Sequence, residues 1–529
     1  MQSLAITNGL VWTGSREAQA VLVEDGRVRA VGSNEDVLGA APPDATIVDV
    51  EGRRVVPGLI DSHTHFVRAG LTWNDVVRWD DISSLAEGLE RIRLATRRMP
   101  PGSWIRVMGG WHPGMLAERR GPTRADLDDV APHNPVYVQL LYEEAVVNSV
   151  ALRSAFPDPA SVEGVELSED GSPTGRLLRP AAFRAVIERF EQPSLDGQVA
   201  STEALGRDFA SLGVTGVIDP GGFGVTPDSY HALFAAHRTG RLPVRVRLYL
   251  VPSAPGRELD DVRTWVRYIH PRFGDDMVSY IGMGEVLAFG CHDMEGVHPH
   301  RVTEEAKRLL AEITRLLVAH DWPIHLHAIL DETISEVLEV WEEIDRERPI
   351  SGRRFSLAHA EPIGDTNLRR AARLGLGIAV QDRLIFRAAD SARLWGEDVL
   401  RRSPPLRDIL ELGIPLGAGT DATVVAPHDP WRCIWWLVTG ESLDGAPPRD
   451  PRHRLTVTEA LTAYTVGSAW FSFEEEKRGM LEPGYLADLA VLDRDPFRIP
   501  PDSLPGTRSA LTLVGGQPVY VSTAFSGLT

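Results

Sequence analysis

Eight apolar runs, separated by segments with helical periodicity, most constrain how this chain can fold. The runs are rich in β-branched residues and lie at 55–63, 214–219, 244–250, 278–286, 323–328, 355–360, 376–380 and 414–421. Continuous rather than alternating apolar sequence is typical of strands buried on both faces of a parallel sheet. Eight such strands, with helices expected over segments such as 304–319 and 333–344, predict an α/β fold of the (β/α)8 TIM-barrel type. An open doubly wound sheet is disfavoured because no glycine fingerprint for phosphate follows the first run.

The two ends of the chain have a different pattern, with short strands and tight turns. Asn8-Gly9 and Asp25-Gly26 are flanked by apolar residues, as in β-hairpins, and Gly515-Gly516 is a similar turn signal. Neither segment is long enough to bury a core alone. We therefore predict a composite β-sandwich from residues 1–56 and 479–529, a barrel over 57–478, and a subdomain inserted at about 67–210, after the first strand.

Composition limits the classes of partner. The chain has 529 residues, is 43% hydrophobic and 24% charged, as expected for a globular protein, and carries a formal net charge of −19. Nucleic acids and anionic membranes attract basic surfaces, so we predict that neither is a partner. Cys291 and Cys433 are the only cysteines, the N-terminus lacks the pattern of a signal peptide, and no apolar run is long enough to span a membrane. We expect a cytoplasmic location.

Residues able to bind a metal stand at the C-terminal ends of four predicted strands. His63 and His65 end the first run and are two residues apart, so both imidazoles point to one face of a strand. The fifth run carries His325 and His327, the sixth carries His359, and the eighth ends at Asp421. A lone His-x-His is a common loop feature, but barrel enzymes assemble their sites from C-terminal strand ends. Imidazoles and a carboxylate in this pattern indicate a hydrolytic metal centre with an open coordination position.

Several motifs are similar to those of a known family. They are Pro57-Gly-Leu-Ile-Asp-Ser-His-Thr-His, Pro122-Thr-Arg, Val147-Asn-Ser-Val-Ala-Leu, His327-Ala-Ile-Leu-Asp, Ala358-His-Ala, Gly419-Thr-Asp, Glu459-Ala-Leu-Thr-Ala-Tyr-Thr and Gly479-Met-Leu-Glu-Pro-Gly. In combination, over nearly the whole chain, they resemble the amidohydrolase superfamily. Within it they are most similar to the branch of metal-dependent hydrolases (amidohydrolase family 3) that includes N-substituted formamide deformylase. The resemblance implies a metal-bearing barrel with a small β-sandwich made from both termini.

The resemblance also implies roles for the strand-end residues. His63 and His65 would bind one ion, His327 and His359 a second, and Asp421 would bind the first ion and act as general base. The expected cofactor is one or two divalent metal ions, with zinc preferred and manganese or iron as alternatives. The expected reaction is hydrolysis of a non-peptide C–N bond in a small-molecule amide, formamide or cyclic amide by metal-activated water. A mononuclear hydrolytic deaminase is the alternative enzyme, and an inactive homologue that only binds a ligand is the alternative of another class.

The chain departs from the family pattern at the fourth strand. Relatives often bridge two metals through a carboxylated lysine, but Lys307 and Lys477 are the only lysines here, and neither is on a predicted strand. Alignment of residues 283–290 with the family segment places Glu285 at the lysine position. We predict that Glu285 bridges two ions. The alternative is a glutamate paired with an arginine at the edge of the core, which would leave a mononuclear site.

Four further residues are candidates for contact with the substrate. Glu143 stands where relatives commonly have a histidine, five residues before Asn148. His292 follows the fourth strand in a loop rich in potential ligands, and Trp111 lies in the predicted insertion. His325 is expected to support the metal ligands or to pack, and not to bind the ion itself. A homodimer is a candidate assembly, although the sequence leaves the oligomeric state open.

Overall fold

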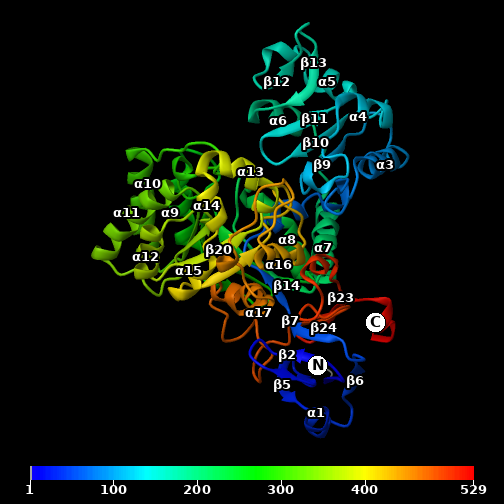
Figure 1. The fold of residues 1–529 in the computed structure, drawn as a ribbon, viewed down its shortest axis with the longest axis vertical. Helices are drawn as coiled ribbons and strands as arrows, with labels where there is room; N and C mark the ends of the chain where they lie inside the picture. Colours follow the sequence, from blue (N-terminus) through cyan, green and yellow to red (C-terminus); the bar gives the residue numbers. More distant parts are fainter. Residues whose placement is uncertain (1–2, 529) are drawn as a thin grey trace.

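A computed structural model describes residues 3–528, and a barrel of eight parallel strands lies at its centre (Figure 1). In order around the sheet the strands are β8 (Leu59–Asp61), β14 (Val214–Asp219), β15 (Arg245–Leu250), β17 (Val278–Glu285), β18 (Ile324–Ala328), β19 (Ser356–His359), β20 (Gly377–Gln381) and β21 (Leu416–Gly419). A short strand, β16 (Phe273–Gly274), pairs with β17. Backbone hydrogen bonds from Ser62 N to Ala418 O (3.0 Å) and from Asp421 N to His63 O (2.8 Å) join the last strand to the first. The predicted (β/α)8 barrel is confirmed. Residues 1, 2 and 529, which the predicted terminal ranges include, lie outside the described residues.

Helices connect these strands or follow the last of them, and they pack apolar faces against the barrel. They are α2 (Phe66–Gly70), α7 (Leu195–Ser211), α8 (His231–Arg238), α9 (Glu258–Tyr268), α10 (Glu304–Ala319), α11 (Asp331–Glu347), α12 (Asp365–Leu374), α13 (Leu384–Trp395), α14 (Glu397–Arg402), α15 (Leu406–Glu411), α16 (Pro430–Thr439), α17 (Val457–Thr462) and α18 (Ser468–Trp470). The α10 helix has the bounds expected from its sequence, because Thr303 caps its first turn by accepting from Ala306 N. Within residues 3–528, no helix combines the length and the apolar character needed to cross a membrane.

The first apolar run is divided between two sheets, which its continuous pattern did not predict. Strand β7 (Arg54–Pro57) pairs with β2 (Leu10–Trp12) and β22 (Leu489–Leu492), whereas β8 enters the barrel. Gly58 separates the two strands, and a Cβ at this position would lie 2.2 Å from the Thr215 hydroxyl oxygen. Only glycine allows so close an approach. The chain therefore passes from one sheet to the other within a single residue.

Strands from both ends of the chain share the sheets that surround β7. One sheet has the order β24-β23-β22-β7-β2-β3 and the other β5-β4-β1-β6. The remaining bounds are β1 (Leu4–Thr7), β3 (Glu17–Ala18), β4 (Ala20–Glu24), β5 (Arg27–Gly32), β6 (Thr46–Asp49), β23 (Ser509–Val514) and β24 (Gln517–Val521), with α1 (Asn34–Ala40) between β5 and β6. Val21, Val55, Leu489 and Leu511 belong to one buried cluster between them. Figure 1 shows the N and C ends of the chain in this lobe.

Buried ion pairs connect the lobe formed by both ends of the chain to the barrel. Asp488, next to β22, accepts from Arg245 Nε of β15 at 2.8 Å and from Arg478 Nε at 3.2 Å. All three side chains are at least 96% buried. Burial by itself would raise the pKa of Asp488, but Arg245 and Arg478 hold that pKa below its usual value. The carboxylate is therefore ionised at neutral pH and balances two buried guanidinium groups.

Replacing Asp488 by asparagine is expected to lower the free energy of unfolding at pH 7 by about 3–5 kcal/mol, because buried Arg245 loses its carboxylate partner and buried Arg478 keeps only Glu474. Because the folded-state pKa of Asp488 is lowered, its contribution is complete above about pH 4 and is lost as the pH falls below that value. Urea denaturation between pH 3 and 8 measures both effects. The exposed Asp170→Asn is the matched control. A loss below about 1 kcal/mol at pH 7, the range of surface ion pairs, would contradict this account.

A further lobe, coloured light blue to cyan in Figure 1, stands away from the barrel. It contains a sheet of order β12-β13-β11-β10-β9. The strands are β9 (Ile105–Met108), β10 (Val136–Leu140), β11 (Glu144–Val147), β12 (Val165–Leu167) and β13 (Pro173–Leu177), and the helices are α3 (Leu85–Thr96), α4 (Arg124–Val130), α5 (Ser149–Ala155) and α6 (Pro180–Ile187). Two apolar clusters of its own stabilise the lobe, one around Trp79 and one around Tyr137. We refer to it as the inserted lobe.

Candidate metal centre

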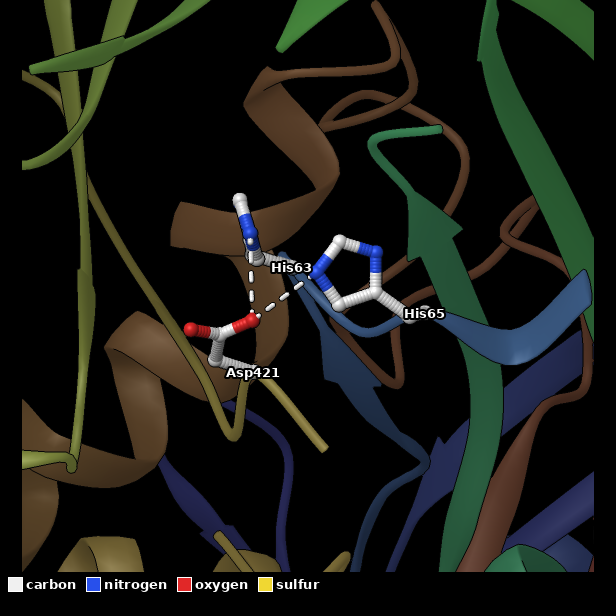
Figure 2. Close-up of side chains that lie close together, drawn as sticks. All are labelled: His63, His65 and Asp421. Carbon is white, nitrogen blue, oxygen red and sulfur yellow. Dashed lines mark ion pairs between the residues drawn. The ribbon is translucent and has the colours of Figure 1, made fainter. Parts of the chain in front are cut away.

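Six ligand-type side chains from five barrel strands converge at the C-terminal ends of those strands. His63 and His65 follow β8, Glu285 ends β17, His327 lies on β18, His359 ends β19, and Asp421 lies two residues after β21. All six are buried. Figure 2 shows His63 and His65 turned toward one carboxylate oxygen of Asp421. The fold thus brings together residues that are up to 358 positions apart in the sequence, between His63 and Asp421.

Asp421 and Glu285 lie between the imidazoles. Asp421 Oδ1 is 3.1 Å from His65 Nε2 and 3.6 Å from His63 Nε2. Glu285 Oε2 is 3.4 Å from His63 Nε2, 3.6 Å from His327 Nδ1 and 3.9 Å from His359 Nε2. A tetrahedral ion with bonds of about 2.1 Å separates its ligand atoms by about 3.4 Å. These distances are therefore those of ligands that share ions.

Glu285 faces different histidines with its two oxygens. Oε1 lies 3.6 Å from His65 Nε2, whereas Oε2 faces His63, His327 and His359. Among residues 3–528 it forms no ion pair with an arginine. Two groups of three ligands overlap here, His63–His65–Asp421 and His63–Glu285–His359, with donor atoms within 4.8 Å of one another in each. The arrangement suits a carboxylate between two ions.

Hydrogen bonds hold the outer nitrogens of three histidines and leave the inner nitrogens directed at the centre. His65 Nδ1 donates to Gly221 O at 2.8 Å. His63 Nδ1 lies 3.0 Å from His325 Nε2, and His325 Nδ1 lies 2.8 Å from Ser356 Oγ. His327 Nε2 lies 3.0 Å from Asp293 Oδ1. Such outer partners select the tautomer whose remaining lone pair can bind a metal.

Some buried nitrogen atoms of the centre have no hydrogen-bond partner among the described residues. His63 Nε2 is buried and has no hydrogen-bond partner among the described residues, although it points at two carboxylates. Burial by itself would raise the pKa of Asp421, but His63 and His65 hold that pKa well below its usual range. Burial by itself would lower the pKa of His63, but Asp421 and Glu285 in turn raise that pKa to about 10, so the two buried carboxylates draw positive charge to this point, and a bound cation would supply it in place of the proton. The residues present therefore fit a bound divalent metal.

Asp293 is a positioning residue that the sequence pattern did not identify. Its side chain is fully buried, and its second oxygen accepts from Ile329 N and Leu330 N at 3.0 and 2.8 Å. Burial alone would raise its pKa, but the bond to His327 and that residue's charge keep the pKa well below its usual value. Asp293 therefore stays ionised and keeps a proton on His327 Nε2, so that the neutral ring would present its lone pair to a metal at Nδ1.

Asp293→Asn is expected to weaken metal binding by about 10–100-fold, since an amide no longer enforces the His327 tautomer. Competition with a chromophoric chelator measures the affinity directly. Asp293→Glu should recover part of the loss, which a purely structural role would not explain. Unchanged metal affinity in Asp293→Asn would show that the tautomer is set elsewhere.

The pocket around the centre has further polar residues that sequence reasoning missed. They are Arg68, Tyr142, Glu295 and Arg383. Arg68 Nη2 donates to Tyr142 Oη at 2.6 Å, and burial raises the pKa of Tyr142 to about 12, so its hydroxyl stays protonated. Both oxygens of Glu295 are buried without a hydrogen-bond partner among the described residues. Arg68 lies only three residues after His65, and Tyr142 precedes Glu143, but neither position has a local signal of function.

The four candidate substrate contacts occupy different places. His292 lines the pocket and stacks on His327, with ring centroids 3.7 Å apart. His325 lies behind His63 and against Tyr249, outside the pocket lining. Glu143 pairs with Arg387 at 2.9 Å and lines a neighbouring cavity. Trp111 is 3% exposed inside the inserted lobe, where its indole N–H donates to Gln139 O, so we assign it to packing.

Comparison with known proteins places the chain in a family. The sequence model of the amidohydrolase family matches residues 46–520. The chain belongs to the amidohydrolase family. It is 30% identical to N-substituted formamide deformylase of Arthrobacter pascens, over 94% of each chain. This amidohydrolase is therefore a hydrolase, and N-substituted formamide deformylase, to which it is similar, acts on a C–N bond.

Solved structures confirm the fold. An uncharacterized metal-dependent hydrolase from Pyrococcus furiosus is 25% identical and aligns over 94% of this chain and all of its own, with a TM-score of 0.67. Atrazine chlorohydrolase from Arthrobacter aurescens, solved with zinc, aligns over 98% of this chain and 95% of its own with a TM-score of 0.55. At 17% identity the second likeness shows the fold alone.

Proposed function

We propose that this amidohydrolase cleaves a non-peptide C–N bond in a small-molecule amide, formamide or cyclic amide. One observation supports this most strongly: four histidines and two carboxylates meet at the ends of five strands, with outer hydrogen bonds that leave inner lone pairs free. His63, His65 and Asp421 would hold one ion. Glu285, which faces His63, His327 and His359, would hold a second ion together with these histidines. Zinc suits these nitrogen and oxygen donors, and manganese and iron accept them as well.

The chemistry divides between the ion and the protein. When bound, a divalent ion lowers the pKa of water toward neutrality and polarises a carbonyl group. Asp421 Oδ1 faces the two histidines, whereas Oδ2 has no hydrogen bond or ion pair among the described residues. Figure 2 shows Oδ2 directed away from both imidazoles. Asp421 can therefore take a proton from water and return it to the leaving nitrogen, so that amide and water become a carboxylic acid and an amine.

Arg68 and Tyr142 are suited to hold the substrate's carbonyl group. Tyr142 accepts from Arg68 and keeps its own proton for donation into the pocket. Arg68 forms no ion pair with a carboxylate among residues 3–528, so its charge is available to an oxygen that becomes negative during the reaction.

Metal analysis and hydrolysis together test the proposal. Protein purified without chelator should contain one to two equivalents of a transition metal. It should release amine from members of a panel of N-substituted formamides, acyclic amides and cyclic amides. Removal of the metal should abolish turnover, and zinc should restore it. A chain that binds no transition metal, or metal-loaded protein that releases only ammonia with one ion bound, would overturn the proposal; the second result would indicate a deaminase.

A further inference from the structure

A second, larger chamber lies between the inserted lobe and the barrel. Its volume is about 600 Å³, within the range of small-molecule sites. It is lined by the segment that follows β8, by β9 and β10 of the inserted lobe, by α6, and by the loop after β21. Arg68, Tyr142 and Phe223 line both this chamber and the metal pocket. The chamber and the metal pocket therefore adjoin at these three side chains.

The chamber wall is mostly apolar but carries unpaired positive charge. Val76, Trp79, Phe183, Phe190 and Val424 form apolar parts of the wall. Asp80 is the only acidic side chain in the lining, and it pairs with Arg78 at 2.9 Å and with His428 at 3.1 Å. Arg68, Arg106 and Arg184 form no ion pair with a carboxylate within residues 3–528. The charge of the chamber wall is therefore opposite in sign to the net charge of the whole chain, which is −19.

Arg106 is the buried member of this group. Its residue is 7% exposed, and its guanidinium lies over the Phe190 ring at 5.2 Å. Its only hydrogen bond runs from Nε to Asp75 O, at a long 3.4 Å, so both terminal nitrogens can donate into the chamber. Burial lowers the pKa of Arg106, and the Asp75 carboxylate, which forms no ion pair with it, opposes that shift only in part. A buried cation without an anion is costly, and a bound carboxylate would remove that cost.

The position of Arg106 limits the length of a ligand that reaches from the metal pocket to this side chain. Arg106 pairs with Tyr137 across the β9–β10 ladder, and Tyr142 is five residues further along the chain. Five residues of fully extended chain span at most about 17 Å, which is an upper limit for the distance along the strand between Arg106 and Tyr142. A ligand with its amide beside Tyr142 and an anion beside Arg106 therefore spans no more than this distance, and the mostly apolar chamber wall suits a hydrocarbon body between the two groups.

We propose that the chamber binds the apolar part of the substrate and that Arg106 pairs with a carboxylate at its far end. The substrate class is thus an amide attached to an arylalkyl or alkyl carboxylic acid. This inference rests on the proposed function for the identity of the amide, but the binding site can be tested without turnover. Arg106 would select the acid through its planar fork of donors, and Arg184, exposed at α6, would contribute only long-range attraction.

Isothermal titration with 4-phenylbutanoate and its neutral analogue 4-phenylbutan-1-ol tests this assignment on the metal-loaded protein. The acid should bind roughly thirty-fold more tightly than the alcohol, the effect of a buried charge-assisted pair. Arg106→Gln should remove that preference while the alcohol binds as before. The matched control Arg184→Gln should change the affinity for the acid by less than about fivefold, because its charge is exposed.

The outcomes separate this inference from the proposed function. Equal affinity of wild-type protein for acid and alcohol would overturn the site, whether or not Arg106→Gln folds. A preference for the acid that survives in folded Arg106→Gln would also overturn it, since the carboxylate would then bind elsewhere, such as at the metal. Loss of the preference only in Arg106→Gln, in a protein that hydrolyses no amide, would keep the site and refute the proposed function.

Discussion

Asp421→Asn is expected to lower kcat by about a hundred- to ten-thousand-fold, the usual contribution of a general base. Asparagine keeps the shape of the side chain but cannot take a proton at the atom that corresponds to Oδ2. It also removes one negative charge from the centre, where His63 and His65 lie 3.6 and 3.1 Å from Oδ1. The rate must therefore be measured at saturating metal, with the bound metal determined in the same samples.

The pH profile of this variant separates the two roles of Asp421. If Asp421 transfers the proton, metal-saturated Asp421→Asn should remain slow at every pH. If Asp421 serves only as a ligand, excess metal should restore most of the rate. Asp170→Asn, an exposed aspartate of the inserted lobe, is the control for the same chemical change and should match wild type. Recovery of more than about a tenth of kcat at saturating metal would contradict the role as base.

Glu285→Gln is expected to lower the metal content from two ions toward one and to reduce kcat in parallel. Glutamine keeps the side-chain volume but removes the charge from a group that faces four histidines at 3.4–3.9 Å. Loss of a direct ligand should weaken the second ion by more than the 10–100-fold that changes in outer partners cause. Elemental analysis after dialysis against a defined free-metal concentration measures the effect.

Glu295→Gln is the matched control for Glu285→Gln. Glu295 is also a buried carboxylate in the wall of the pocket, but it forms no ion pair with a histidine in the described part of the chain. Its neutral variant should therefore bind as much metal as wild type. Two equivalents of metal in Glu285→Gln would rule out the bridge and leave Glu285 as a group that only shapes the pocket.

Much of the fold could be predicted because its signals are local. An apolar run with β-branched residues reports a strand buried on both faces, and eight such runs allow few architectures. The spacing of His63 and His65 is also a local signal, since residues two apart on a strand point to the same face in any fold. Gly58 was different. The need for glycine there comes from Thr215, 157 residues away, so the break between β7 and β8 was invisible in the sequence.

The rest of the centre was decided by tertiary contacts. Asp293 was one of several acidic residues in a loop until the fold placed it 3.0 Å from His327 Nε2. Arg68 on α2 and Tyr142 after β10 belong to separate segments and meet only in the folded chain. The sequence alone determined the barrel and the types of metal ligand, because strand periodicity and ligand chemistry act over a few residues. The partners of those ligands and the charge of the chamber depend on distances between remote segments, which only the folded chain defines.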